Sequence, residues 1–469
     1  MRHSRKPLPL LQNIEVTQLA AEGKSIAHTA EGVLFIPFAI PGDVVDVQVC
    51  KKKSSYMEGY VVRQVMPSPL RVPPFCSHAG LCGGCKWQAL PYAEQLKWKQ
   101  QQVLDQLTHI GHFKDIEVQP IIGSAQTQFY RNKLEFTFSN KRWVSKEEFQ
   151  CGAAIDQPNA LGFHIPAMFD KVLDIEQCYL QAAPSNEIRD WVKQFAIDHQ
   201  YTFFDLRQQQ GLLRNLIIRT STTGEVMVIV VFSSNDSERI QLLMHDLHRA
   251  FPSITALLYV VNNKGNDTIF DREVICYAGQ PFIIEKMGDL QFKIGAKSFY
   301  QTNSQQAFQL YSVVQQLAQL TGRQTVYDLY TGTGTIACFL ASHAHKVVGI
   351  EITPEAIDDA CENARINGIG NATFFAGDMK DVLTPEFVEH NHKPDVVVID
   401  PPRAGLHPNV VNTLLQTAPE RIVYVSCNPA TQARDLALLA TQYRIQFVQP
   451  VDMFPHTQHV ENVVLLCKI

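Results

Sequence analysis

The sequence contains no apolar segment long enough to cross a membrane. Its longer apolar runs, such as VMVIVVF at residues 226–232, fall far short of the roughly 20 residues that a spanning helix needs. The first residues, MRHSRKPLPLLQ, include basic side chains but neither the apolar stretch nor the cleavage site of a secretory signal. We therefore expect a cytoplasmic protein without a membrane partner.

A strong excess of charge of either sign is also lacking. The 469 residues hold 41 Lys and Arg against 46 Asp and Glu, for a net charge of −5. Taken over the whole chain, this charge disfavours a nucleic-acid binder. The charge is uneven, however, because residues 1–150 hold 18 Lys and Arg against 13 Asp and Glu. Any basic surface is therefore expected at the front of the chain.

Cysteine, in contrast, is abundant. Eleven cysteines is a high number for a reducing compartment, where clustered thiols are more often metal ligands or nucleophiles than disulfides. Cys76, Cys82 and Cys85 have the spacing C-x5-C-x2-C, which favours a metal ion or an iron-sulfur cluster and requires a fourth ligand. The second CxxC or His pair that is typical of zinc sites does not follow, and His78 is badly placed within the loop.

Three regions follow one another along the chain. Residues 1–66 alternate apolar segments with glycine and proline turns, which predicts a small OB-like β-barrel of about five strands. Residues 67–290 combine aromatic and β-branched runs with helical stretches, which predicts an α+β domain whose helix near 92–110 is expected to pack on the last domain. Residues 291–469 alternate strands and helices like a doubly wound, Rossmann-like domain. The predicted fold class is thus multidomain α/β.

The last region carries a candidate cofactor site. The run DLYTGTGTI places Asp328 and Gly332 between a strand and a helix, where the backbone can approach a ligand closely. Glu351 ends the next strand, where a carboxylate can bind both ribose hydroxyls, and Asp378 follows the third, where it can hold an adenine edge. The run lacks the third glycine of a dinucleotide site. It has the pattern of S-adenosylmethionine (SAM)-dependent methyltransferases instead.

The next two strands end in DPPR at residues 400–403 and in Cys427. Amino-group methyltransferases carry an aromatic residue after the two prolines, so Arg403 argues against methylation of an amino group. A cysteine at the carboxyl end of a central parallel strand points toward the ligand crevice, and a buried core thiol is the alternative for a lone cysteine.

Five ordered motifs, DLYTGTGTI, VVGIEI, DPPRAGL, YVSCNPAT and FPHTQHVENVVLL, together resemble those of the RNA uracil-5 methyltransferases, and the resemblance covers the whole chain. Carbon 5 of uracil is too weak a nucleophile to take a methyl group directly, so a thiolate must first add to carbon 6. The resemblance implies that Cys427 is this nucleophile and that Glu461 is the base that removes the proton from carbon 5.

The resemblance also implies binding positions for two cofactors and for the target base. A branch of the family binds a [4Fe-4S] cluster through C-x5-C-x2-C and a distant cysteine, which corresponds here to Cys178, with Cys151 as the competing candidate. Methyl transfer does not need this cluster, so its expected role is structural. Phe299 could stack on the uridine, which must leave its stack to react. The SAM positions are Gln301, Tyr330, Glu351 and Asp400.

The first region resembles the TRAM module, an OB-like RNA-binding fold. Arg131 and Lys133 in FYRNKLEF would add phosphate contacts that position the RNA. We therefore expect a monomeric enzyme that methylates carbon 5 of a uridine in 23S ribosomal RNA and does not act on DNA. A transfer-RNA uracil-5 methyltransferase and a non-catalytic RNA-binding assembly factor are the alternatives.

Overall fold

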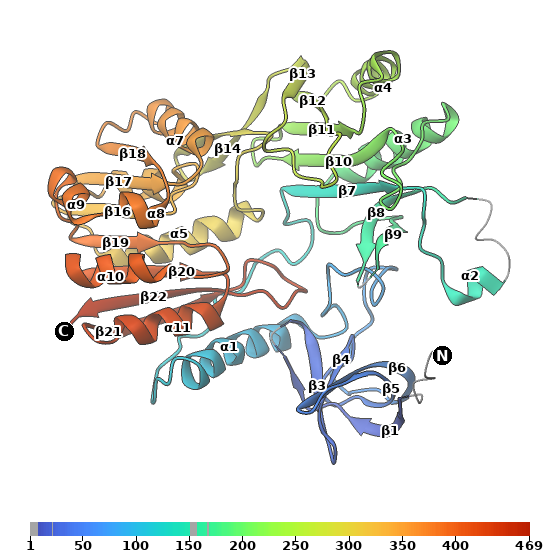
Figure 1. The fold of residues 1–469 in the computed structure, drawn as a ribbon, viewed down its shortest axis with the longest axis horizontal. Coiled ribbons are helices and arrows are strands. Elements are labelled where there is room, and N and C mark those ends of the chain that lie inside the picture. The colour runs from blue at the N-terminus through green and yellow to red at the C-terminus, as the bar shows by residue number, and fades with distance from the viewer. Residues whose placement is uncertain (1–7, 21, 151–156, 167) are drawn as a thin grey trace, which may run out of the picture.

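A computed structural model describes residues 8–20, 22–150, 157–166 and 168–469. Figure 1 shows three sheets at three corners of the molecule: an N-terminal barrel in blue, a middle sheet in green and a C-terminal sheet in orange and red. Within the described ranges, no helix has the length and apolar character that crossing a bilayer requires.

Two strands that follow one another in the chain lie at the two ends of the strand order in the N-terminal barrel. β1 (Leu10–Glu15) pairs with β5 (Val44–Lys52), and shortly afterwards β2 (Gln18–Leu19) pairs with β3 (Lys24–Thr29) on the other side. The hydrogen-bonded ring is completed by β4 (Gly32–Pro37) and β6 (Tyr56–Met66). Aliphatic side chains such as Leu34, Ile36 and Val47 fill the interior. This arrangement confirms the small barrel that the turn spacing predicts.

The middle region is a seven-stranded sheet in the order β13-β12-β11-β10-β7-β8-β9. Its two central strands, β10 (Leu213–Thr220) and β11 (Val226–Phe232), are buried almost throughout, which explains their continuous apolar runs. Two helices, α3 and α4, pack on one face. The remaining elements are α2 (Lys146–Gln150), α3 (Ser185–Asp198), α4 (Ser237–Ala250), β7 (Lys133–Ser139), β8 (Ala160–Ile165), β9 (Met168–Asp174), β12 (Ala256–Val261) and β13 (Val274–Gly279).

A hairpin joins the middle and C-terminal regions. Its strands, β14 (Phe282–Met287) and β15 (Leu290–Gly295), pair with each other. Ile283 and Phe292 of the hairpin share one buried cluster with Ile229 of the middle sheet and Val326 of the C-terminal sheet. The domain boundary expected at residue 290 therefore falls inside this hairpin, and the two regions have a continuous core.

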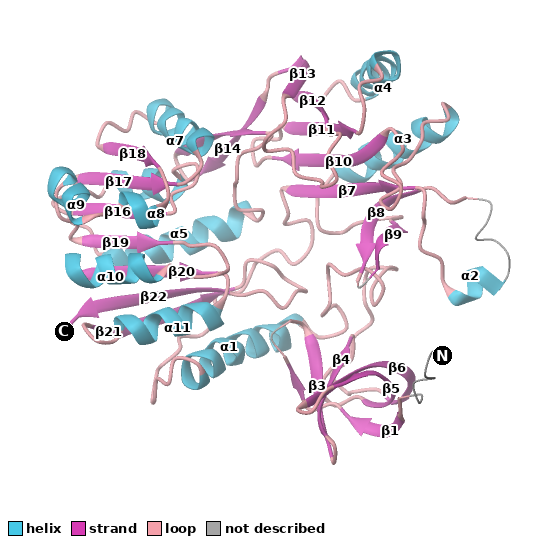
Figure 2. Ribbon diagram, viewed as in Figure 1, coloured by secondary structure: helices cyan, strands magenta, loops and turns pink. Residues whose placement is uncertain are grey.

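The C-terminal sheet has the order β18-β17-β16-β19-β20-β22-β21, in which the first five strands are parallel and β22 is antiparallel to both of its neighbours. Figure 2 shows its strands lying between helices. Along β16, Val326 and Tyr327 enter clusters on opposite faces, as strand geometry requires. The strands are β16 (Thr325–Leu329), β17 (Lys346–Glu351), β18 (Ala372–Ala376), β19 (Val396–Ile399), β20 (Arg421–Ser426), β21 (Tyr443–Val451) and β22 (Glu461–Lys468).

Helices cover both faces of this sheet, so the doubly wound domain is confirmed. They are α5 (Ser304–Ala318), α6 (Thr335–Ala341), α7 (Pro354–Ile366), α8 (Met379–Val382), α9 (Pro385–Asn391), α10 (Pro408–Thr417) and α11 (Pro429–Leu439). At the start of α11, the Asn428 side chain accepts a hydrogen bond from the Ala430 N–H, and Pro429 takes the first helical position, where the missing N–H costs no bond.

Helix α1 (Tyr92–His109) packs on the C-terminal sheet, although the barrel and the cysteine loop precede it and the middle sheet follows it. Its Val103 and Leu107 join the buried cluster on the α10–α11 face. Lys99 donates to Asp452 Oδ1 at 2.6 Å, and both side chains are fully buried. The helix therefore covers the sheet beside the loop that precedes β22.

Candidate active site

A cavity of about 820 Å³ opens at the carboxyl ends of the parallel strands. This is the position where doubly wound sheets bind their ligands, because the loops after neighbouring strands meet there. Most of the residues predicted for catalysis, cofactor and substrate line this one cavity. They are Arg131, Phe299, Gln301, Tyr330, Gly332, Glu351, Asp378, Asp400, Cys427 and Glu461.

The turn after β16 forms one wall of the cavity. Tyr330 and Gly332 both have left-handed backbone conformations, with φ of 65° and 55°. Glu351 at the end of β17 fixes this turn, because its Oε2 accepts from the Gly332 N–H at 3.2 Å and its Oε1 from the Thr353 N–H at 3.0 Å. A Cβ on Gly332 would meet nothing within 4 Å, so this glycine is needed for its conformation and leaves the space before it open.

Asp328 does not line the cavity, in contrast to its predicted cofactor role. Its side chain is fully buried and accepts hydrogen bonds from Thr331 Oγ1 and from the Ala337 N–H, the latter at 3.0 Å. Burial raises the pKa of Asp328 to about 7. The carboxyl group therefore stabilises the glycine turn and the start of α6 through hydrogen bonds from the interior of the domain.

Cys427 and Glu461 meet because β20 and β22 are antiparallel neighbours. The last pair of their ladder is Ser426 with Asn462. Cys427 directly follows Ser426 and Glu461 directly precedes Asn462, so both residues lie at the same end of the ladder and face the cavity. Cys427 and Glu461, 34 positions apart in the chain, are thus held at the cavity end of two paired strands.

Burial and nearby negative charge raise the pKa values of Cys427, Glu461 and the neighbouring Asp400. Burial raises the pKa of Cys427 to about 11, with Glu461 and Asp400 adding to the effect. Burial also raises the pKa of Glu461 to about 8 and that of Asp400 to about 7. The Arg403 guanidinium opposes the shift at both Cys427 and Glu461. The two carboxyl groups can therefore exchange protons near neutral pH, as general base catalysis requires.

Aromatic and basic side chains form the rim of the cavity. Phe299 is 67% exposed, although phenylalanine is a residue that folding usually buries. Arg131 donates to Thr302 Oγ1 at 3.3 Å and lies over the Phe454 ring. Lys133 faces the neighbouring cysteine cavity instead, and burial lowers its pKa. Its predicted phosphate contact is therefore not at the catalytic cavity.

Two rim residues, Phe270 and Lys297, are absent from the sequence-based prediction. Phe270 belongs to a loop of the middle region, between β12 and β13, and Lys297 follows β15. Neither belongs to a motif. The only signal is an aromatic residue in an otherwise polar loop, and that signal is common in sequences.

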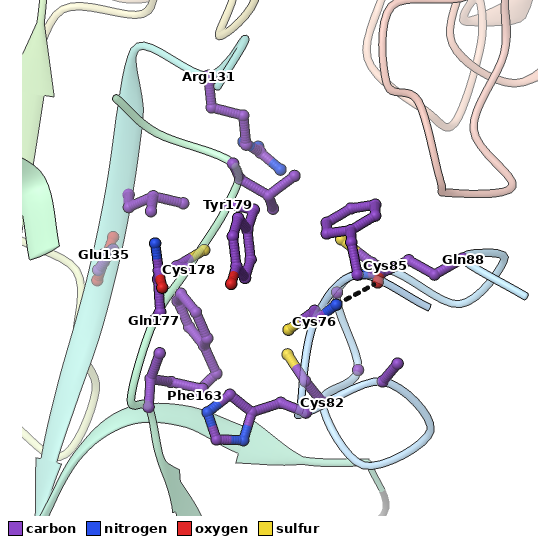
Figure 3. A pocket seen from close by; sticks show the side chains of 18 of the residues that line it. Cys76, Cys82, Cys85, Gln88, Arg131, Glu135, Phe163, Gln177, Cys178 and Tyr179 are labelled. Carbon is purple, nitrogen blue, oxygen red and sulfur yellow. Dashed lines mark hydrogen bonds between the residues drawn. The ribbon is translucent and has the colours of Figure 1, made fainter. Parts of the chain in front are cut away.

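Four of the cysteines line a second cavity of about 440 Å³ (Figure 3). Cys76, Cys82 and Cys85 come from the loop before α1, and Cys178 comes from the segment after β9 on the opposite side. Burial is the main cause of the raised pKa of Cys85, about 12, and the three other thiols add to it. The structure therefore brings together the four thiols that the resemblance selects.

The described ranges contain no group of three or more His, Cys, Asp or Glu side chains arranged around a single metal ion. A four-iron cluster places its ligand sulfurs further apart than one ion does, since each sulfur binds a different iron. The donor set and the shared cavity fit such a cluster. His78 is occupied elsewhere, because its Nε2 accepts from the Glu176 N–H at 3.0 Å. Cys151 lies outside the described residues.

Comparisons with known proteins agree with this geometry. Residues 206–469 match the tRNA (Uracil-5-)-methyltransferase family, and residues 11–62 match the TRAM domain. An uncharacterized RNA methyltransferase of Bacteroides thetaiotaomicron is 56% identical over 96% of this chain and 99% of its own length. A similar protein of Chlorobaculum tepidum is 40% identical over 96% of this chain and 95% of its own length.

A solved structure is similar along the whole chain. The Pyrococcus abyssi tRNA (uracil-54, C5)-methyltransferase in complex with S-adenosyl-L-homocysteine has a TM-score of 0.75 and 29% identity, and the match covers 97% of this chain and 100% of that one. Family model, relatives and structure all lead to one assignment. The chain belongs to the RNA uracil-5 methyltransferase family and carries an N-terminal TRAM domain.

Proposed function

We propose that the protein methylates carbon 5 of a uridine in 23S ribosomal RNA through a covalent adduct with Cys427. The observation that carries this proposal is the position of Cys427 and Glu461 at one end of the β20–β22 ladder, in the cavity that also contains the Glu351 turn. A non-catalytic RNA-binding factor would have no need to hold a thiol and a carboxyl group together in this way.

The chemistry requires two groups on this chain. The thiolate of Cys427 adds to carbon 6 of the uracil, which makes carbon 5 nucleophilic. Carbon 5 then takes a methyl group, which SAM supplies when bound. Glu461 removes the proton from carbon 5, the double bond between carbons 5 and 6 re-forms, and the Cys427 thiolate leaves. A carboxyl group with a pKa of about 8 is well matched to a base that acts near neutral pH.

SAM would be held by the glycine-turn side of the cavity. The open space before Gly332 lets the ligand approach the backbone, and Glu351 stands at the strand end where ribose hydroxyls bind. Tyr300, beside Gln301, has a buried hydroxyl group that finds no hydrogen-bond partner among the described residues. The residues proposed to contact SAM are Gln301, Tyr330, Gly332, Glu351, Asp378 and Asp400.

The second cavity is proposed to hold a [4Fe-4S] cluster through Cys76, Cys82, Cys85 and Cys178. Metal binding would supply positive charge that stabilises thiolates in a site where burial otherwise keeps them protonated. The cluster would join the loop before α1 to the segment after β9. Its proposed role is therefore to fix the middle region against the RNA, and it supplies no step of methyl transfer.

We propose a division of labour that follows the three regions. Residues 1–66 bind RNA through the TRAM barrel, residues 67–290 hold the cluster, and residues 291–469 carry out methyl transfer.

Transfer RNA is the second candidate substrate. The match to the Pyrococcus abyssi tRNA methyltransferase, which covers 100% of that chain, favours this second substrate. The presence of a barrel and a middle region therefore does not by itself indicate a ribosomal RNA substrate.

One assay separates the two substrates. The protein is incubated with labelled SAM and either unmodified 23S ribosomal RNA or unmodified transfer RNA, and 5-methyluridine is mapped in the product. We expect stoichiometric methylation of one uridine in 23S ribosomal RNA. Methylation of transfer RNA alone would show that transfer RNA, and not 23S ribosomal RNA, is the substrate. Full turnover by the Cys427→Ala protein would contradict the covalent mechanism.

A further inference from the structure

We propose that Phe270 is a second base-stacking residue, which holds an unpaired nucleobase next to the methylated uridine at the mouth of the catalytic cavity. This inference rests on the proposed function, since it concerns how the same site selects RNA. It adds a subsite from the middle region to a cavity whose reacting groups all belong to the C-terminal sheet.

The exposure of Phe270 is the first observation. Its side chain is 64% exposed, whereas the preceding Ile269 is 8% exposed and belongs to the large buried cluster. Ile269 therefore anchors the loop, and Phe270 stands free of the core while lining the catalytic cavity. Phe169 is similarly exposed away from the cavity, so it is the position of Phe270 on the cavity rim, together with its exposure, that points to contact with a ligand.

The loop that carries Phe270 is braced from inside. Arg214, which is 1% exposed, donates to the carbonyl oxygens of Asn262 at 2.8 Å, Lys264 at 2.5 Å and Asn266 at 3.1 Å. It also donates to Asp267 Oδ1 at 2.8 Å. A buried arginine that bonds four groups of one loop holds its backbone in a single conformation. Phe270 thus follows an ordered stretch of backbone, which lowers the entropic cost of binding.

The cavity rim offers two aromatic rings to RNA. Phe299 is 67% exposed and follows Lys297 by two positions, and both residues line the same cavity as Phe270. One ring is enough for the target uracil. A second exposed ring suits a neighbouring base, because every base presents a π-face and a nucleotide that leaves its stack also exposes its neighbours. Lys297 can contact the phosphate between the two bases.

The test compares Phe270→Ala and Phe270→Tyr with the wild-type protein on a short RNA fragment that the wild type methylates, taken from 23S ribosomal RNA or transfer RNA. Phe270→Ala should raise the KM for RNA about tenfold, as loss of one base–aromatic stack predicts, with kcat and SAM binding unchanged. Phe270→Tyr should restore the KM. The melting temperature should not change, because the side chain is exposed. Phe169→Ala is the matched control, since Phe169 is 66% exposed but lies outside the cavity.

RNA fragments with an abasic site at each nucleotide next to the target locate the contact. One abasic site should raise the KM of the wild type about tenfold and leave that of Phe270→Ala unchanged, because the two changes remove the same contact. Additive effects at every position, or an unchanged KM for Phe270→Ala, would overturn the inference while the wild type still methylates. A wild-type protein that methylates neither RNA would overturn the proposed function and this inference with it.

Discussion

The two cavities of this protein both contain thiols that are at least partly buried, but the side chains around those thiols differ. In the catalytic cavity, Cys427 is a single thiol beside two carboxyl groups and the Arg403 guanidinium. In the cysteine cavity, Cys85 lies near three other thiols. A lone thiol with proton-exchanging partners suits a reaction that makes and breaks a bond. Four thiols gathered in one cavity suit a permanent ligand.

The largest expected effect comes from removing the lone thiol. Cys427→Ala should lower methyl transfer by more than about 10³-fold, as the loss of a catalytic nucleophile does, without a change in iron content. The measurement is transfer of labelled methyl groups to RNA. Cys361→Ala is the control, because Cys361 is exposed on α7 and does not line the cavity. Equal losses of methyl transfer in the Cys427→Ala and Cys361→Ala proteins would contradict the role of Cys427 as the nucleophile.

Glu461→Gln should also stop turnover, with a loss of about 10²- to 10⁴-fold, but for a different reason. Addition and methylation precede the step that needs the base, so the methylated RNA should remain bound to Cys427. A band of protein joined to labelled RNA on a denaturing gel would show this adduct. The double variant Cys427→Ala/Glu461→Gln should give no band, and a band from it would place the covalent bond on another residue.

In the cysteine cavity, Cys85→Ser should abolish iron binding and raise the KM for RNA about tenfold, equivalent to about 1.4 kcal/mol, while kcat is retained. Iron analysis, absorbance spectra and steady-state kinetics measure the three quantities. Cys276→Ser is the control, since Cys276 is an exposed thiol on β13 of the middle sheet. A loss of kcat with an unchanged KM would assign the cluster to chemistry rather than to structure.

The smallest expected effect concerns the pH dependence of thiol reactivity. The pKa of Cys427 is about 11, so its alkylation by iodoacetamide should accelerate as the pH rises from 6 to 9. Glu461 becomes anionic as the pH passes its pKa of about 8 and then disfavours the thiolate. At pH 9, Glu461→Gln should therefore react several-fold faster than the wild type, whereas at pH 6 the two should be equal. Mass spectrometry of the Cys427 peptide measures both alkylation rates. Equal rates at pH 9 would show that the charge of Glu461 does not influence the Cys427 thiol.

Much of the fold could be predicted because the relevant signals are local. The alternation of strands and helices after residue 325 predicts the doubly wound domain, and glycine turns predict the barrel. The position of Glu461 beside Cys427 could not be derived from local patterns, since it depends on β22 inserting antiparallel between β20 and β21. Only the resemblance to a family selected Glu461 over an ordinary surface glutamate.

Other site residues show where sequence patterns stop being informative. Asp328 belongs to a cofactor motif, but its carboxyl group stabilises the glycine turn through buried hydrogen bonds. The direction of its side chain decides between these two roles, and the sequence does not give that direction. Lys133, at the start of β7, lines only the cysteine cavity, whereas Arg131, two residues earlier and outside the strand, lines both cavities, a difference that their spacing in the sequence does not reveal. Phe270 reaches the cavity from a loop of another region, a contact that depends on how the regions pack together.

The packing of α1 has a consequence for how the enzyme is made. Lys99 and Asp452, which bond to each other in the interior, are 353 positions apart, so the ribosome must release almost the whole chain before they can meet. Until then the face of α1 that contains Val103 and Leu107 has no partner, and contacts of this separation form slowly. A fragment that begins at residue 291 would lack this cover and leave Asp452 buried without its cation. The domain that carries the catalytic cavity therefore gains its α1 cover only late in synthesis, after the loop before β22 has been made.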